Sequence, residues 1–332
     1  MNETKRVLNR KASERYYEAY RHHLRDTDAF EQLACVGRLD RIVAAASAVP
    51  TAAIQQIPGF HLRRRYPVKP QRQGDFVSYG WVARIAGINS IREVMIYSDR
   101  QAKWLAPAKI IVIARDALGL QFPDMCSIFE LLTEPQIIDV ELACDFATDS
   151  IVDVKFVEKH ALFGKSRPRN VGTNPLYSSY GRRVGTKFVR SYFKPELNCQ
   201  RVEFSFHLRD LARFGIKDIF NLHKLGVVLP RHIWFARLSP QKLQQKLYRD
   251  GFSIEKQQAI LCEAEKLEGN LCQTLKYLRR TARLKNTRRL LVPLDDINRV
   301  VLAAISKWAA EWAESYPTQK LTRPPTAHPI VE

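Results

Sequence analysis

The sequence lacks the patterns that mark a metal site built from cysteine or histidine. Its six cysteines are scattered, with no CxxC pair and no histidine at zinc-finger spacing, and its eight histidines form no HxH or HExxH motif. We therefore interpret the cysteines as reduced thiols and expect no histidine-ligated metal. No internal repeat is present either, which argues against a solenoid or propeller.

Long apolar runs are also missing. No stretch approaches the roughly 20 apolar residues that a membrane-spanning helix needs, and the first twenty residues contain no apolar run of the kind found in signal peptides. We therefore expect a cytoplasmic protein that does not insert into a membrane.

Negative charge is scarce. Against 53 Lys and Arg there are 34 Asp and Glu, which gives a formal net charge of +19 over 332 residues. Such an excess favours a polyanionic partner, because phosphate neutralisation releases counterions. Nucleic acid is the leading candidate, and a membrane surface is the alternative.

Residue patterns along the chain predict an α+β fold, a mainly antiparallel sheet domain flanked by helical segments. Residues 1–70 are expected to form two helices that end near Pro50, followed by a basic segment (61–75) that is either a linker, an arm along a phosphate backbone or a solvated loop. β-branched and aromatic runs predict strands within 76–113, and a further strand is expected at 136–148 after a short helix at 123–134. Together with a helical segment at 208–226, residues 71–238 would form the central domain.

The remainder of the chain predicts a C-terminal helical region and a tail. Residues 239–316 are expected to be helical, with Ser253 or Asp250 as a cap and Asp295 and Asp296 opening the last helix. The proline-rich residues 317–332 are expected to be disordered.

The densest positive charge lies in the C-terminal region. Residues 275–290 hold seven basic residues and no acid, and as a helix they would suit a phosphate backbone or a groove. The alternative is an ordinary solvated helix face. The residues predicted to contact DNA here are Arg279, Arg280, Arg283 and Lys285.

Strand alternation places a tyrosine among charged residues. In "KFVRSYFK" (187–194), Arg190, Tyr192 and Lys194 share one face. In "CQRVEFSFH", Glu203 is on the polar side and Val202, Phe204 and Phe206 are on the core side. In "IIDVELACDF", the alternation puts Val140, Leu142, Cys144 and Phe146 on one face and Asp139, Glu141, Ala143 and Asp145 on the other.

If these strands pair, Glu141, Asp145 and Glu203 converge near Tyr192 and offer an all-oxygen site for Mg²⁺ or Mn²⁺. A tyrosine there could attack a phosphodiester, with Arg190 and Lys194 favouring the phenolate. The alternatives are a packing tyrosine, a solvated row of cations, and a structural salt bridge from Glu203 to Arg190 or Arg201.

The segment "LYSSYGRRVGTKFVRSYFKPELNCQRVEFSFHLRDLARFGI" resembles the signature region of the plasmid and phage replication initiation factor family, the rolling-circle initiators. Upstream, "FELLTEPQIIDVELACDF" is similar to the family's helix and strand bearing two acids, here Glu141 and Asp145. The chain differs from the common pattern at Phe193 and Glu141. The positions that match the signature are Tyr177, Gly181, Arg182, Gly185, Arg190, Tyr192, Lys194, Arg201 and Glu203.

This resemblance implies a metal-dependent, topoisomerase-like nicking and joining enzyme of rolling-circle DNA replication. It would bind a plasmid or phage origin as single strand or cruciform, join Tyr192 to the 5′ phosphate and free a 3′ hydroxyl. The partners that the resemblance implies are origin DNA, a host helicase and polymerase, and a second copy of the chain. Residues expected to hold DNA phosphates are Arg182, Arg183, Lys187, Arg190, Lys194 and Arg201.

Two other functions remain open from the sequence. One is a sequence-specific DNA-binding regulator without catalysis. The other is a mobilisation relaxase or a tyrosine transposase, which would share the reaction and serve a different process.

Overall fold

The computed structural model describes residues 35–68, 79–101, 103, 105–115, 118–147, 152, 154–163, 168–169, 177–181, 187–229 and 233–316. Its main element is an antiparallel sheet in the order β2-β3-β4-β5-β1-β6-β11-β10-β9-β8. These strands are β1 (Cys35–Ala46), β2 (His61–Pro67), β3 (Tyr79–Ala86), β4 (Ile91–Arg100), β5 (Ala108–Ala114), β6 (Gln136–Ala147), β8 (Pro168–Arg169), β9 (Tyr177–Gly181), β10 (Lys187–Lys194) and β11 (Cys199–His207).

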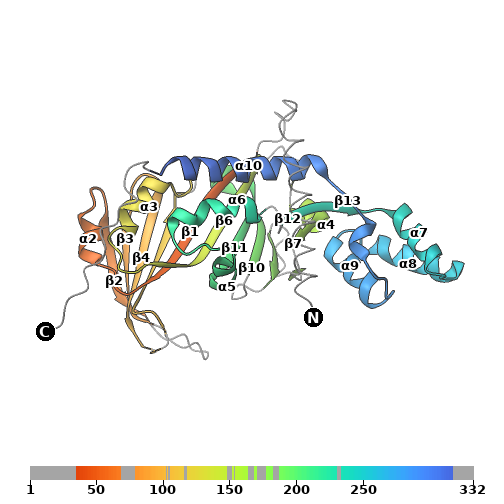
Figure 1. The fold of residues 1–332 in the computed structure, drawn as a ribbon, viewed down its shortest axis with the longest axis horizontal. Coiled ribbons are helices and arrows are strands. Elements are labelled where there is room, and N and C mark those ends of the chain that lie inside the picture. The colour runs from red at the N-terminus through yellow and green to blue at the C-terminus, as the bar shows by residue number, and fades with distance from the viewer. Residues whose placement is uncertain are drawn as a thin grey trace.

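One face of this sheet packs against a long helix, α10 (Asp295–Glu314), which runs along the sheet in Figure 1. Helix residues Ile305, Trp308 and Trp312 are buried in the same core as the inward residues of β6 and β11. Gly37 of β1 lets the helix approach, because a Cβ at that position would lie 2.7 Å from the Ala304 carbonyl oxygen.

Short elements complete the cover of this face. They are α3 (Phe122–Phe129), α5 (Leu208–Arg213), the 3₁₀ turn η2 (Ile219–Lys224) and α6 (Leu225–Val228). The indole Nε1 of Trp312 donates a hydrogen bond of 2.9 Å to the Ile219 carbonyl, which joins α10 to η2. The helices predicted at 123–134 and 208–226 are therefore present, the second as three short pieces.

A second core lies at the C-terminal end of the fold. A three-stranded sheet, β13 (Leu291–Pro293), β12 (Ile233–Leu238) and β7 (Ala161–Phe163), packs with α7 (Pro240–Arg249), α8 (Ile254–Lys266) and α9 (Leu271–Arg280). Figure 1 shows these three helices beyond the small sheet, away from the large one. α4 (Val154–His160) leads into β7.

The predicted C-terminal helices are confirmed. The Ser239 and Ser253 hydroxyls accept from the backbone N–H groups of Lys242 and Lys256, so that both residues cap a helix. Asp250 instead ends α7 as its C-cap. Asp295 and Asp296 open α10 as expected.

The prediction of a helix that ends at Pro50 is wrong for the described residues of this segment. Cys35–Ala46 form β1, which lies between β5 and β6 in the middle of the sheet. The alanine-rich run favours a helix by propensity, but pairing on both edges and burial outweigh that preference. The short helix α2 (Thr51–Gln56) begins only after Pro50. Residues 1–34, also predicted helical, lie outside the described part, as does the tail 317–332.

The basic segment 61–75 is also different from the prediction where it is described. Its residues 61–67 form β2, an edge strand of the large sheet, and not a linker. The sheet therefore takes strands from both sides of the boundary predicted at residue 70. In the same way, α10 packs on the large sheet and not with the other C-terminal helices.

Candidate active site on the polar face of the sheet

Three neighbouring strands bring the predicted polar faces together. β11 lies between β6 and β10, and its Glu203 pairs with Arg190 on one side and Ala143 on the other. Residues opposite each other in a sheet share a face. Because the alternate residues of β6 and β11 are buried in the core shared with α10, the predicted alternation of both strands is confirmed.

β1 adds three charged residues that the sequence patterns did not assign to the site. The register of β1 with β6 shifts between Leu39 and Arg41, so Asp40 is the extra residue of a β-bulge. Arg38, Asp40 and Arg41 all contact carboxylates or arginines of the polar face, while Leu39 and Ile42 are buried in the core. The charges of "GRLDR" were the available signal, and interpreting this segment as a helix concealed it.

We call the resulting cluster the acid–arginine network. Among the described residues it contains four arginines, five carboxylates and one histidine, whose Nδ1 pairs with Asp139. Its members are Arg38, Arg41, Arg190, Arg201, Asp40, Asp139, Glu141, Asp145, Glu203 and His207.

In one half of this network, Arg201 binds two carboxylates, Asp145 and Asp40. Its side chain is 0% exposed, and its Nε and Nη2 donate to the two oxygens of Asp145 at 2.6 and 2.8 Å. Its Nη1 donates to Asp40 at 2.8 Å. Arg38 also donates to Asp145, at 3.1 Å. A buried guanidinium is stable only when carboxylates satisfy it in this way. The predicted contact of Arg201 with a DNA phosphate would therefore require these carboxylates to release it.

In the other half of the network, Glu203 accepts hydrogen bonds from Tyr192 and Arg190. The Tyr192 hydroxyl donates to Glu203 Oε1, and Arg190 Nε donates to Glu203 Oε2. Arg190 also reaches Glu141 at 3.4 Å, and Glu141 accepts from the Ser205 hydroxyl at 3.0 Å. Tyr192 and Arg190 remain partly exposed, whereas Glu203 is 1% exposed. The phenol thus lies at the boundary between a buried carboxylate and solvent.

The electrostatics around Tyr192 differ from the expectation that neighbouring cations favour the phenolate. Burial raises the pKa of Tyr192 well above its ordinary value, and the negative charge of Glu203 raises it further. Arg190 and Arg201 lower it, but by less. Burial also raises the pKa of Glu203. In this network the phenol therefore keeps its proton and donates it in a hydrogen bond.

Three carboxylates of the network form an acidic triad that could hold a metal ion. Asp40, Glu141 and Glu203 each place an oxygen within 4.8 Å of the other two. This all-oxygen set suits Mg²⁺ or Mn²⁺. Two of the three were predicted. The third, Asp40, was not predicted, and the predicted Asp145 is not a member of this closely spaced set; both of its oxygens contact arginines.

Of the other residues predicted for this region, the structure describes Lys187 and Lys194 but not Arg182 and Arg183. Lys194 follows on the same strand as Tyr192 and is buried, with 8% of its surface exposed. Lys187 pairs through its backbone with Phe206. Arg182 and Arg183 lie outside the described residues.

The basic stretch 275–290 is not one helix. α9 ends at Arg280, and the chain then turns through Arg283 and Asn286, which both have positive φ, into a 3₁₀ turn (Thr287–Leu290). Its seven basic side chains are nevertheless all exposed. We call them the C-terminal basic cluster: Lys276, Arg279, Arg280, Arg283, Lys285, Arg288 and Arg289.

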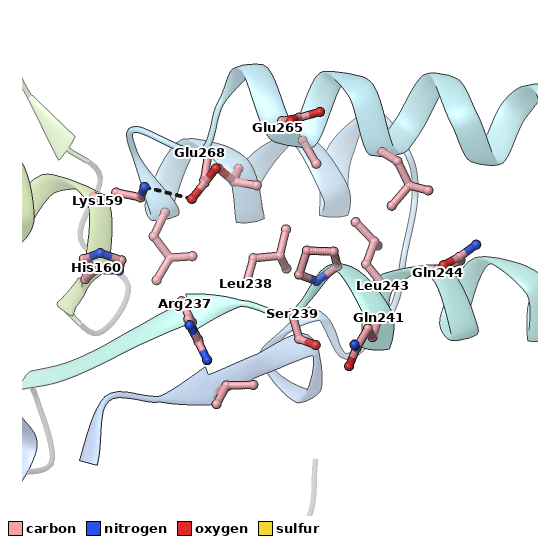
Figure 2. Close-up of a pocket in the computed structure, with 16 residues that line it drawn as sticks. Lys159, His160, Arg237, Leu238, Ser239, Gln241, Leu243, Gln244, Glu265 and Glu268 are labelled. Atoms are coloured by element: carbon pink, nitrogen blue, oxygen red, sulfur yellow. Dashed lines mark ion pairs between the residues drawn. The ribbon is translucent and has the colours of Figure 1, made fainter. Parts of the chain in front are cut away.

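A cleft of about 880 Å³ lies between the small sheet and helices α7 to α9. Figure 2 shows Lys159 and Glu268 facing each other at one end of it, joined by an ion pair of 2.8 Å. Arg237, Ser239 and Gln241 line the opposite wall. The cleft shares no residue with the acid–arginine network, so it does not enter the chemistry considered for Tyr192.

Within the described residues, no helix is both long and apolar enough to cross a membrane. When the chain was compared with models of known protein families and with curated protein sequences, no match was found in either comparison.

Proposed function

We propose that this chain is a metal-dependent DNA nicking and closing enzyme, acting as a rolling-circle replication initiator at a plasmid or phage origin. The observation that carries the proposal is the contact between the Tyr192 hydroxyl and Glu203, inside a carboxylate triad and beside Arg190. The resemblance of residues 176–216 to the replication initiation factor family adds to it, because Tyr192 and Glu203 are two of the matched positions.

The chemistry is a transfer of one phosphodiester bond. The Tyr192 oxygen attacks phosphorus and forms a new O–P bond to the 5′ phosphate, while the bond to the 3′ oxygen breaks and that oxygen leaves as a hydroxyl. Since burial keeps the phenol protonated, a base has to take its proton, and Glu203 is already the acceptor. One phosphoester replaces another, so rejoining needs no ATP.

The other network residues prepare this step. Arg190 lies beside both Tyr192 and Glu203, with its Cζ 5.5 Å from the tyrosine ring centroid, and would bind the scissile phosphate once it swings toward solvent. Asp40, Glu141 and Glu203 would hold Mg²⁺ or Mn²⁺. When bound, such an ion neutralises charge that develops on the phosphate oxygens. Movement of Arg190 would also open Glu141 and Glu203 to the ion.

A non-catalytic DNA-binding protein is the second candidate. It is favoured by one observation, which is that every carboxylate of the triad already has an arginine partner. In that case the network would be a structural core of paired charges, and the basic surfaces alone would bind DNA.

Supercoiled plasmid that carries the chain's own gene separates the two candidates. Incubation with Mg²⁺ should yield open circles with protein attached to one strand if the proposal is correct. Supercoils that stay intact, although a gel shift shows binding, would support the regulator. A relaxase or transposase would also nick, so the origin role needs the nick to map to a replication origin and to free a 3′ end that a polymerase extends.

The C-terminal basic cluster gives a separate prediction about affinity. Replacing Arg279, Arg280 and Arg283 by Ala should weaken binding to all DNA sequences alike. The slope of log K against log salt should become shallower by about 0.9 for each DNA phosphate that the variant no longer neutralises. Filter binding at several salt concentrations measures this slope.

The matched control removes the same charge from lysines that are already paired. Lys246, Lys266 and Lys307 each contact an acid of their own helix or its C-cap. Their triple Ala variant should leave the slope nearly unchanged. If both triple variants shift the slope equally, net charge alone explains binding and the cluster is a solvated surface.

A further inference from the structure

The face that carries the acid–arginine network continues over four more strands. Arg41 of β1 pairs with Ile113 of β5, and four residues along, Ala45 pairs with Lys109, so Lys109 is on the same face as Arg41. From there Lys109 pairs with Tyr97 of β4, which in turn pairs with Val82 of β3. The same face of the sheet is therefore continuous from the network toward the β2 edge.

At that edge, β2 contributes a further cation and ring. Arg64 pairs with Arg84, and Tyr66 pairs with Val82, the residue that also pairs with Tyr97. These side chains thus share the face of Lys109. We call this set the basic–aromatic strip. Its members are Arg64, Tyr66, Arg84, Tyr97 and Lys109.

Cations and rings alternate along the strip. Lys109 Nζ lies 4.4 Å from the Tyr97 ring centroid and 5.3 Å from that of Tyr79. Arg64 Cζ lies 4.6 Å from the Tyr66 ring centroid. Arg84 is neutralised by Glu93, but Lys109 and Arg64 have no carboxylate within ion-pair distance in the described part of the chain. Two cations of the strip are therefore free to bind an anion.

The strip adjoins the candidate active site and is reachable. Arg64 is exposed, and Tyr66, Tyr97 and Lys109 are partly exposed. Lys109 is close enough to Arg41 and Asp139 for their charges to act on its pKa, which burial lowers. With neighbouring strands about 4.8 Å apart, four spacings from β1 to β2 cover about 19 Å, enough for a few nucleotides.

We propose that the basic–aromatic strip binds the single-stranded DNA that leads to the phosphate cleaved at Tyr192. This inference rests on the proposed function. Phosphates would contact Lys109 and Arg64, and bases would stack on the tyrosine rings. Single-stranded DNA is the occupant that fits both features, because the faces of bases in a duplex are already stacked on each other and cannot use the rings.

The test compares two adjacent arginines. Arg64 and Arg65 are both exposed, on the same strand, and each lies over an aromatic ring. Arg65, however, pairs with Ala83, which is buried in the core on the opposite face of the sheet. Each is replaced by Ala in the full chain carrying Tyr192→Phe, without divalent metal, so that no cleavage occurs. Binding of fluorescent oligothymidylate and of a duplex of equal length is then measured by anisotropy over a salt series.

We expect Arg64→Ala to weaken binding to oligothymidylate several-fold, with the salt slope reduced by about 0.7, the value for one phosphate contact on a single strand. Tyr97→Leu should weaken it about tenfold, because one stacking platform is removed. Arg65→Ala should have neither effect, and duplex binding should change little in any variant.

The proposal for the strip would be overturned if Arg64→Ala and Arg65→Ala weakened oligothymidylate binding equally. It would also be overturned if the strip variants lost as much affinity for the duplex as for oligothymidylate. Unchanged oligothymidylate binding in Arg64→Ala and Tyr97→Leu would do so too, and would leave the face to another occupant such as residues 1–34. The proposed function is judged separately, by whether the wild-type chain forms a covalent adduct. If the wild-type chain forms an adduct and the strip variants bind oligothymidylate normally, only the proposal for the strip is rejected. If the wild-type chain forms no adduct but the strip variants bind more weakly, only the proposal of nicking is rejected.

Discussion

Tyr192→Phe should abolish covalent attachment of the chain to DNA. The wild-type protein, incubated with Mg²⁺ and an origin oligonucleotide labelled on the 5′-phosphate side of the nick, should carry the label through a denaturing gel. The Phe variant removes one oxygen and keeps the ring, so the nucleophile is absent and no label should remain with the protein. DNA binding should be retained, because the phosphate contacts are unchanged.

The same variant has a small cost in stability. Glu203 loses the hydrogen bond from Tyr192 but keeps Arg190 as a partner. Removing this bond should lower the free energy of unfolding by about 1.5–3 kcal/mol, the range for a hydrogen bond to a charged group. A urea titration checks that the variant is folded under the labelling conditions.

Two other tyrosines serve as controls. Tyr177 is the backbone pairing partner of Tyr192 across β9 and β10, and Tyr180 pairs with Val189. Register makes Tyr177 the closer competitor for the role of nucleophile. Tyr177→Phe and Tyr180→Phe should both keep the label. A label that survives in Tyr192→Phe and disappears in either control would move the nucleophile and remove the basis of the proposed mechanism.

The sequence predicted the polar faces of β6 and β11 correctly because alternation is a local property. Each strand has a run of core residues at every second position, so the face of Glu141 and Glu203 follows without knowing the sheet order. Whether these faces meet was left open by the sequence. Their meeting requires β11 to lie between β6 and β10, which depends on contacts between distant segments.

Asp40 could not be predicted in the same way. Its place in the triad depends on a β-bulge, which changes the alternation of β1 at one residue and has no clear signature in "GRLDR". The alanines after it also favour a helix when considered alone, and only pairing with β5 and β6 makes the segment a strand. The missed Asp40 and the wrong helix therefore have the same cause, which is that pairing of β1 with distant strands cannot be seen in the sequence.

The protonation of Tyr192 was mispredicted for a physical reason. The sequence shows Arg190 and Lys194 beside it, which indicates a lowered pKa, but it does not show burial. In the fold, burial and the adjacent Glu203 both raise the pKa and outweigh the arginines. The consequence is that the tyrosine needs a base to react, and the same contact supplies one.

Two conservative substitutions can separate a metal-binding role of Asp40 from a structural role of Asp145. Asp40 and Asp145 both contact Arg201, and Asp→Asn removes one negative charge in each case. Asp40 is a member of the triad, whereas Asp145 lies outside it and is the bidentate partner of the buried Arg201. The two variants should therefore fail in different ways, one in metal binding and the other in stability.

For Asp40→Asn we expect nicking in Mg²⁺ to fall about 100-fold or more, because a direct metal ligand is removed where even outer partners of a metal site cost 10–100-fold. Stability without metal should fall by only about 1 kcal/mol, since Arg201 keeps both bonds to Asp145. Added Mg²⁺ should raise the urea midpoint of the wild type through binding to the folded state, and it should raise that of Asp40→Asn much less.

For Asp145→Asn we expect the reverse. Arg201 is fully buried, and weakening its bidentate partner should destabilise the fold by about 3 kcal/mol, the lower end of the range for a broken buried ion pair, because Asp40 still contacts it. Mg²⁺ should still raise the urea midpoint, and nicking below the unfolding transition should persist. If Asp145→Asn loses the effect of Mg²⁺ while Asp40→Asn retains it, the metal is bound by Glu141, Asp145 and Glu203, and Arg201 must then release Asp145 when the ion enters.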